Sequence, residues 1–231
     1  NSLGEMMISS RHGDFAVKKG DKLAGTRIIP LVIEEEKMLA ARKAAGTEPV
    51  FRILPFHHKK VGIVTTGSEV QKGRITDTFT PVLKEKLGVF PTEVIGQTTP
   101  GDDREQITRD ILRLIEAGAD LVLASGGMSV DPDDRTPGAI KDTGARIVSY
   151  GAPVLPGAML LVAYFEHNGK QIPIIGLPGC VMYAKQTVFD LILPRIMADD
   201  IVTAEELSAL GEGGLCLNCE VCTFPNCGFG K

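Results

Sequence analysis

Tryptophan is absent from the sequence, and aromatic residues make up only 5% of it. The core must therefore be aliphatic, and the aromatic stacking surface of single-stranded nucleic-acid binders is missing. The net charge is −4, whereas attraction to nucleic acid or to anionic membranes requires an excess of basic residues. The longest apolar run, residues 152–165, is interrupted by Pro153, Pro156 and Gly157 and is too short to span a bilayer. The composition predicts neither a nucleic-acid partner nor a membrane segment.

The sequence shows no signal peptide at its start, so we expect a cytoplasmic protein. The first residue is Asn1 rather than methionine, which indicates a piece of a longer protein. The 231 residues suffice for one large domain or for a domain with an appendage. With 43% hydrophobic and 23% charged residues, the composition is ordinary for a globular chain.

Residues 59–198 alternate between short apolar runs and helical patterns, which indicates an α/β domain. The runs predict a mostly parallel, doubly wound sheet with helices on both faces. We expect strands at 61–65, 92–97, 120–124, 146–150 and 172–176, and helices at 78–88, 103–117, 136–143 and 180–197.

The two ends of the chain differ from this central region. Residues 1–58 contain strand-like pieces within 17–33, a helical run at 34–45 and a second strand-like run at 49–57. We interpret them as a small, β-rich part of a neighbouring domain with its connector. Residues 199–231 form a polar linker and a cysteine-rich tail. The expected domains are therefore 1–58, 59–198 and 199–231.

A glycine turn follows one of the buried runs. Leu121–Ala124 leads into Ser125, Gly126 and Gly127, which let the backbone turn sharply and let a ligand approach the main chain. Polar turns at strand ends are where open α/β sheets bind ligands. Of the carboxylates that follow, Asp131 and Asp133 are expected to be solvated loop charges. Asp134 is the better site candidate, because Thr136 and Pro137 after it are typical of a helix start.

A second buried run is also followed by polar residues and a glycine. Val61–Val64 is followed by Thr65, Thr66, Gly67 and Ser68, whose hydroxyls and amides suit phosphate oxygens. Asp77 precedes the next helix, where it either caps the helix or points into a cleft. Carboxylates in the cleft could hold the Mg²⁺ that accompanies a nucleotide.

Four of the five cysteines fall in the tail, with the spacing C-x₂-C-x₂-C-x₄-C. Thiols this close in a cytosolic chain suit a metal better than disulfides. The leading C-x₂-C-x₂-C resembles ferredoxin spacing and thus an iron–sulfur cluster, whereas zinc ligand pairs are usually further apart. A flexible tail without metal is the alternative. The candidate ligands are Cys216, Cys219, Cys222 and Cys227.

The order of these motifs resembles the molybdopterin-binding domain of molybdenum cofactor biosynthesis enzymes. The resemblance covers residues 59–198 and is carried by Val61–Glu69, Asp77, Ser125–Gly127, Asp133–Pro137 and Leu177–Gly179. The segment 17–55 is also similar to the one preceding this domain in the molybdopterin molybdenumtransferases. The resemblance implies a three-layer α/β/α fold, a homo-oligomer, and small-molecule partners: a pterin with a terminal phosphate and a nucleotide.

The resemblance also implies roles for individual residues. One branch of the family adenylylates the pterin phosphate with Mg²⁺ and ATP, and another uses the product to insert molybdate. Asp77 and Asp134 match the family's functional aspartates. Residues that would bind molybdopterin are Thr66, Gly67, Ser68, Glu69, Ser125, Gly126, Gly127, Ser129, Pro178 and Gly179.

The sequence departs from the molybdate-inserting branch in two places. Ala158 and Met159 stand where that branch has Lys-Pro, and Cys180 and Val181 stand where it has Asn-Pro. Without the lysine, a cation that neutralises an oxyanion is lost. Two alternatives to a biosynthetic enzyme therefore stay open. One is a non-catalytic carrier or sensor of the finished cofactor, and the other is a nucleotide pyrophosphatase like the competence-damage-inducible family.

Overall fold

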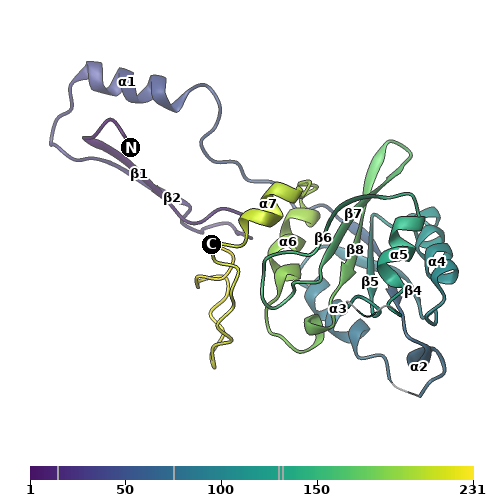
Figure 1. The fold of residues 1–231 in the computed structure, drawn as a ribbon. Coiled ribbons are helices and arrows are strands. Elements are labelled where there is room, and N and C mark those ends of the chain that lie inside the picture. The colour runs from purple at the N-terminus through teal and green to yellow at the C-terminus, as the bar shows by residue number, and fades with distance from the viewer. Residues whose placement is uncertain (15, 75, 130, 132) are drawn as a thin grey trace. The chain divides into compact units, whose positions relative to one another are not determined.

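The computed structural model describes residues 1–231 apart from positions 15, 75, 130 and 132 (Figure 1). The chain forms two compact units, Asn1–Pro55 and Phe56–Lys231, and the second unit includes the cysteine-rich tail. The domain boundaries expected at residues 58 and 198 stay predictions.

The first unit is a hairpin followed by a helix. Strand β1 (Met6–Ser10) pairs antiparallel with β2 (Ala24–Ile28), and α1 (Glu35–Ala45) ends at Gly46, whose φ is +76°. The helix at 34–45 is confirmed, and β1 was not predicted. The strand-like run at 49–57 is wrong, because these residues form no strand. Pro49 and Pro55 have no N–H to donate to a ladder.

The second unit is built on a six-stranded sheet in the order β4-β3-β5-β8-β7-β6. Four adjacent strands of this sheet run parallel to one another. They are β4 (Thr92–Thr98), β3 (Lys59–Thr65), β5 (Leu121–Ser125) and β8 (Lys170–Leu177). Strands β7 (Leu161–His167) and β6 (Arg146–Tyr150) extend the sheet antiparallel. The mostly parallel sheet is confirmed.

Strand β7 is the one that the sequence reasoning missed in this sheet. It begins within the apolar stretch 152–165, which was considered only as a possible membrane segment. β7 and β8 are joined by Asn168 and Gly169, whose φ angles are +51° and +75°. Asn-Gly is the preferred pair for a tight hairpin because both positions need positive φ. The Asn168-Gly169 dipeptide was therefore the sequence signal from which the β7–β8 hairpin could have been predicted.

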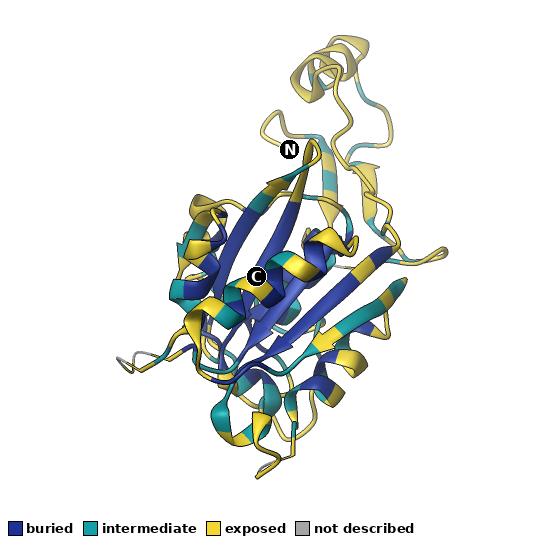
Figure 2. Ribbon diagram, turned by 90° about the vertical axis from the view of Figure 1, so that its right-hand side faces the viewer, coloured by how far each residue is buried: buried dark blue, intermediate teal, exposed yellow. Residues whose placement is uncertain are grey.

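Helices cover both faces of the sheet (Figures 1 and 2). Helices α3 (Phe79–Leu87) and α6 (Val188–Met197) pack on one face, and α4 (Arg104–Glu116) and α5 (Thr136–Asp142) pack on the other. The central strands are buried almost throughout because both of their faces are covered. The architecture is therefore a three-layer α/β/α domain.

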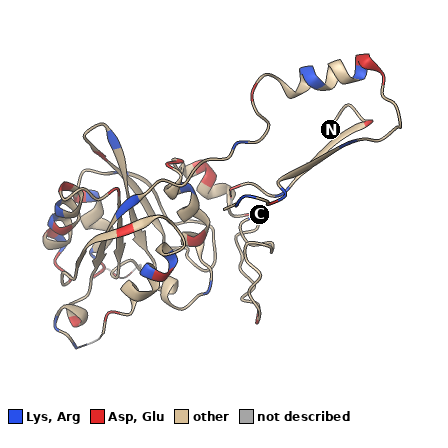
Figure 3. Cartoon of the chain, turned by 180° about the vertical axis from the view of Figure 1, so that it is seen from behind, with Lys and Arg blue, Asp and Glu red and all other residues tan. Residues whose placement is uncertain are grey.

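Helix α4 shows how the sequence sets this packing. The Asp103 side chain accepts the backbone N–H groups of Glu105 and Gln106, which caps the helix start. Ile107, Ile111 and Leu114 follow at helical spacing and are buried against the sheet. Acidic and basic side chains alternate along the remaining faces (Figure 3).

The single helix predicted over 180–197 is wrong. The structure has a 3₁₀ turn, η1 (Gly179–Met182), then a loop, and α6 begins only at Val188. Thr187 caps α6 in a capping box, in which Asp190 accepts the Thr187 N–H at 2.7 Å and Thr187 Oγ1 accepts the Phe189 N–H at 3.2 Å. Residues 183–186 line one wall of a pocket instead of continuing a helix.

The tail is fixed to the α/β domain at its base. After α7 (Ala204–Ala209), Leu215 forms a parallel bridge with Leu155, and Gly230 donates to the Gly213 carbonyl at 2.9 Å. Phe229 is only 5% exposed and belongs to the core on the α3 and α6 face. In the described residues, every helix falls short of the length and apolar character needed to cross a membrane.

Candidate functional site

The predicted site residues lie at the carboxyl edge of the parallel strands. In the sheet register Thr65 is paired with Ser125, and Ser125 is paired with Leu177. The turns after β3, β5 and β8 therefore begin side by side. The structure thus brings together the Thr66–Ser68, Ser125–Gly127 and Pro178–Gly179 segments, which are far apart in the sequence.

The glycine turn after β5 lies directly against the turn after β3. The Thr66 N–H donates to the Ser125 carbonyl at 2.7 Å. Gly126 and Gly127 have φ angles of +86° and +53°, and a Cβ on Gly126 would lie 2.4 Å from the Thr66 carbonyl oxygen. Glycine is required at Gly126 both by backbone conformation and by space.

Thr136, the first residue of α5, links both turns. Its hydroxyl donates to the Gly126 carbonyl at 2.7 Å and lies 3.2 Å from the Thr66 hydroxyl. Thr136 is fully buried and Thr66 is 5% exposed. The helix predicted to start after Asp134 therefore holds the glycine turn in place.

Polar atoms at this edge are left without partners. Within the described part of the chain, three buried side-chain atoms lack a hydrogen bond, and they are Thr98 Oγ1, Ser125 Oγ and Asp134 Oδ2. Ser125 and Asp134 were predicted as site residues. Thr98 was missed, although as the last residue of β4 it is paired with Val64, next to the turn after β3. Buried polar groups are normally paired, so these three atoms have unused hydrogen-bonding capacity at this edge.

Asp134 is accompanied by a tyrosine that the sequence analysis also missed. The Tyr150 hydroxyl, at the end of β6, donates to the Ser129 carbonyl at 3.1 Å. Burial, and then the negative charge of Asp134, raise the pKa of Tyr150 above its ordinary value. Asp131 and Asp133 are exposed, as predicted, and Asp133 lies 3.6 Å from Arg135.

Replacing Asp134 by asparagine is expected to lower the pKa of Tyr150, because the carboxylate charge opposes formation of the tyrosinate. The pKa should stay above 10.0, since burial is the larger cause of its increase. An alkaline absorbance titration, with the Tyr150→Phe chain subtracted, measures the shift. Asp133→Asn is the matched control and should leave the titration unchanged. An equal pKa in the wild-type and Asp134→Asn chains would contradict the electrostatic influence of Asp134 on Tyr150.

Asp77 caps helix α3. Its Oδ1 accepts the N–H groups of Phe79 and Thr80 at 2.9 and 3.0 Å. Its Oδ2 accepts the Thr80 hydroxyl at 2.5 Å and the Gln97 amide at 3.0 Å. Of the two roles left open by the sequence, the structure shows the cap. All lone-pair directions of this carboxylate are in use, so Asp77 has little capacity left for a metal ion.

Asp77→Ala is expected to lower the free energy of unfolding by about 1–2 kcal/mol, because the first turn of α3 loses its cap. Asp77→Asn keeps an acceptor oxygen for the Phe79 and Thr80 N–H groups and should cost less. Urea denaturation of both chains measures the difference. Equal losses would show that the cap is not what Asp77 contributes.

Three further predicted site residues, Ser68, Glu69 and Pro178, differ in their contacts and exposure. Ser68 begins the short helix α2 (Ser68–Gln71), and its N–H and hydroxyl donate to Asp102 Oδ2 at 3.0 and 2.6 Å. Asp102 was not anticipated from the sequence. Glu69 is exposed. Pro178 is buried and leads into η1, so the Leu-Pro-Gly turn joins the sheet edge to the wall of the pocket described next.

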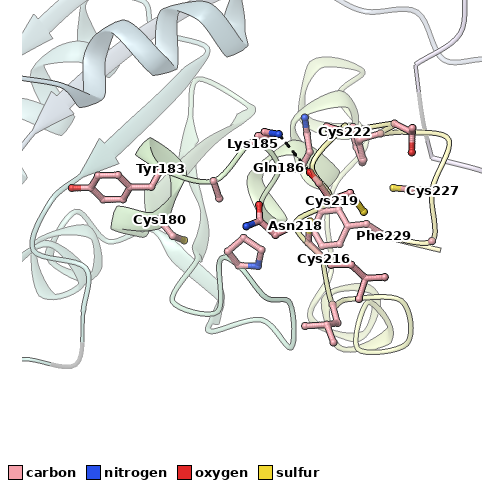
Figure 4. Close-up of a pocket in the computed structure, with 17 residues that line it drawn as sticks. Cys180, Tyr183, Lys185, Gln186, Cys216, Asn218, Cys219, Cys222, Cys227 and Phe229 are labelled. Carbon is pink, nitrogen blue, oxygen red and sulfur yellow. Dashed lines mark hydrogen bonds between the residues drawn. The ribbon is translucent and has the colours of Figure 1, made fainter.

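A pocket of about 570 Å³ lies between the 180–186 segment and the tail (Figure 4). All five cysteines line it, and all five are free. Burial raises the pKa of the Cys180 thiol. Among the described residues, no three His, Cys, Asp or Glu side chains are already gathered around a point where a metal ion could bind. The predicted metal at the tail therefore stays a prediction.

The strand order and the position of the glycine turns define an open, doubly wound α/β domain. The chain belongs to the family described as "Probable molybdopterin binding domain", whose sequence profile matches residues 62–198. This confirms the resemblance stated from the sequence.

Individual relatives are more distant. The molybdopterin molybdenumtransferase of Synechococcus elongatus is 28% identical over 203 residues, which are 80% of this chain and 47% of the relative. A putative competence-damage inducible protein of Bacillus velezensis is 32% identical over 88 residues, or 38% of this chain and 21% of the relative. The chain thus spans less than half the length of these relatives.

Solved structures give weaker similarities. The tungsten cofactor synthesizing protein MoaB from Pyrococcus furiosus superposes with a TM-score of 0.47 at 18% identity, covering 62% of this chain and 89% of that chain. The fold assignment rests on the strand pairing of this chain itself.

Proposed function

We propose that this chain binds molybdopterin at the carboxyl edge of its sheet and promotes Mg²⁺-dependent chemistry at the pterin phosphate. The observation that supports this most directly is the presence of unpartnered polar atoms on Thr98, Ser125 and Asp134 in the described residues. A buried polar group left unpaired costs about 1–3 kcal/mol. A ligand that supplies the missing partners would recover this free energy on binding.

The residues of this edge suit a phosphate-bearing ligand. Gly126 and Gly127 carry no side chain, so phosphate oxygens could approach the main chain closely. The Ser125 hydroxyl would donate to the ligand, and the Thr66–Ser68 turn would form the facing wall. Because Thr136 locks Gly126 to Thr66, this frame is rigid before the ligand arrives.

Asp134 is the better candidate for holding Mg²⁺. Its Oδ2 has no partner in the described residues, whereas both oxygens of Asp77 are occupied. Mg²⁺ bound there would neutralise phosphate charge, which is most of what phosphoryl transfer requires of a protein. In this assignment Asp77 is a positioning residue, which fixes the start of α3 beside the site.

Adenylyl transfer suits the chain better than molybdate insertion. In that reaction a pterin phosphate oxygen attacks the α-phosphorus of ATP, and pyrophosphate leaves. The lysine of the molybdate-inserting branch is replaced here by Ala158, so a cation for an oxyanion is missing at that position.

The test is to incubate the protein with molybdopterin, ATP and Mg²⁺ and to separate the pterin and nucleotide products by chromatography. An adenylylated pterin and pyrophosphate, formed only when all three are present, are the expected result. Pterin retained on the protein without any product would instead favour a carrier or sensor. Failure to retain pterin would contradict the proposal.

A nucleotide pyrophosphatase is the second candidate. It is favoured by the competence-damage relatives, which are more similar in identity although the match is short. This activity would split a nucleotide pyrophosphate in the absence of pterin. Incubation with a nucleotide sugar and Mg²⁺ alone distinguishes it from adenylyl transfer.

A further inference from the structure

Every cysteine of the chain faces a single pocket. Cys180 lies on η1, on one wall, and the four tail cysteines line the other (Figure 4). Cys216 and Cys227 are half-buried against the core, while Cys219 and Cys222 are exposed. Thiols that are far apart in the sequence converge on this cavity, although the carboxyl-edge site does not use them.

The tail is a loop with fixed ends and an adaptable middle. The bridge between Leu155 and Leu215 and the bond from Gly230 to Gly213 close the loop at its base. The turn between the two exposed cysteines is held through one side chain, since Lys185 Nζ donates to the Cys219 and Glu220 carbonyls at 3.5 and 2.9 Å. Such a loop can close around a bound group without disturbing the sheet.

The arrangement of the thiols distinguishes between two kinds of metal centre. A tetrahedral zinc ion with Zn–S bonds of about 2.3 Å requires sulfur atoms about 4 Å apart. Among the described residues the cysteines do not form such a group. They surround a space of about 570 Å³ instead. A cubane cluster tolerates more widely spaced thiols than a single zinc ion does, because its four thiolate ligands lie on the outside of an iron–sulfur core.

The pocket wall also suits a cluster. The wall is largely apolar, and the surroundings of the sulfurs are among the factors that set cluster potential. A [4Fe–4S]²⁺ core with four thiolates carries a net charge of −2, and the Lys185 ammonium group lies at the rim to offset it. The apolar lining residues are Pro156, Leu215, Leu217, Phe224 and Phe229.

We propose that Cys216, Cys219, Cys222 and Cys227 bind a [4Fe–4S] cluster in this pocket. The first three have the C-x₂-C-x₂-C spacing that bacterial ferredoxins use for such clusters. Cys227 completes the set because it belongs to the same adaptable loop. Cys180 lies on η1, on the opposite wall and outside the closely spaced cysteines of the tail, and is not assigned as a ligand. The proposal is independent of the chemistry at the carboxyl edge.

The test uses the full chain, with all cysteines reduced, and a synthetic [4Fe–4S] cluster carrying four small thiolate ligands under anaerobic conditions. Each protein thiol gives its proton to one departing thiolate and takes its place on iron, so no oxidant or reductant is needed. We expect one cluster per chain by iron and sulfide analysis after gel filtration, with the cluster's visible absorption. Reduction by dithionite should then give an electron paramagnetic resonance signal.

Variants identify the ligands. Cys216→Ser, Cys219→Ser, Cys222→Ser and Cys227→Ser should each lose most of the bound cluster, whereas Cys180→Ser, the matched control on the opposite wall, should retain it. Unfolding curves of the cluster-free chains verify that each variant is folded. Failure of the wild-type chain to take up a cluster, or uptake that survives every tail substitution, would overturn the proposal. Retention in Cys227→Ser with loss in Cys180→Ser would overturn the assignment of the fourth ligand.

Discussion

The Asp134→Asn chain is expected to lose turnover by about a hundredfold or more while remaining folded. Removing a single group that stabilises charge in a transition state commonly costs this much, or about 2.7 kcal/mol. Asparagine has nearly the shape of aspartate but lacks the negative charge needed to hold Mg²⁺. The expected loss therefore lies in kcat, and it should not be rescued by more substrate. Product formation with molybdopterin, ATP and Mg²⁺ measures it.

A neighbouring residue provides the control. Asp133→Asn changes the net charge by the same amount, but the Asp133 side chain is 94% exposed. It should leave turnover within about twofold, because the charges of solvated groups are screened. The free energy of unfolding of both variants should stay within about 1 kcal/mol of the wild-type value, since within the described residues the buried Asp134 Oδ2 makes no hydrogen bond that would be lost. Normal turnover in Asp134→Asn would exclude the proposed role.

The parallel core of this fold could be predicted because its strands are buried on both faces. Residues 61–65 and 120–124 are short apolar runs that end in polar, glycine-containing turns, and this pattern is local. The carboxyl-edge location of the candidate site could be predicted from the same pattern, since parallel strands bring their ends together. The sequence alone therefore predicts the Thr66, Gly126 and Asp134 segments as parts of the candidate site.

What escaped prediction depends on contacts between distant segments or on capping. The break before α6 is caused by the Thr187 and Asp190 capping box, which was overlooked within an otherwise helical pattern. Thr98 and Tyr150 reach the site from strand ends whose neighbours are defined only by the sheet order. For Asp77 the sequence was equally compatible with a helix cap and with a side chain pointing into a cleft. The structure shows the cap, because the Thr80 hydroxyl and the Gln97 amide both donate to the Asp77 carboxylate.

The cysteine pocket also depends on contacts between segments that are distant in the sequence. The spacing of the tail cysteines indicated a metal, but the sequence could not show that the tail folds back to face Cys180. That arrangement depends on the burial of Phe229 and on the bridge at Leu155. A spacing motif predicts candidate ligands, whereas the arrangement of their side chains around a pocket is a tertiary property.

Gly126→Ala is expected to lower the free energy of unfolding by about 3 kcal/mol and to abolish pterin binding. Two costs add. A left-handed conformation costs a non-glycine residue about 1–2 kcal/mol, and φ at Gly126 is +86°. The new Cβ would also lie 2.4 Å from the Thr66 carbonyl oxygen and 2.7 Å from the Thr66 hydroxyl, which forces the two turns apart. Urea denaturation and pterin retention on gel filtration measure the two effects.

Gly169→Ala separates the two costs. Gly169 also has a positive φ, of +75°, but a Cβ there would meet nothing within 4 Å. This variant should therefore lose only the conformational part, about 1 kcal/mol, and should bind pterin normally. If both variants lost the same stability, the close approach of Gly126 to Thr66 would contribute nothing. A larger loss at Gly126, with pterin binding lost there alone, would mean that the contact between the two turns maintains both the fold and the binding edge.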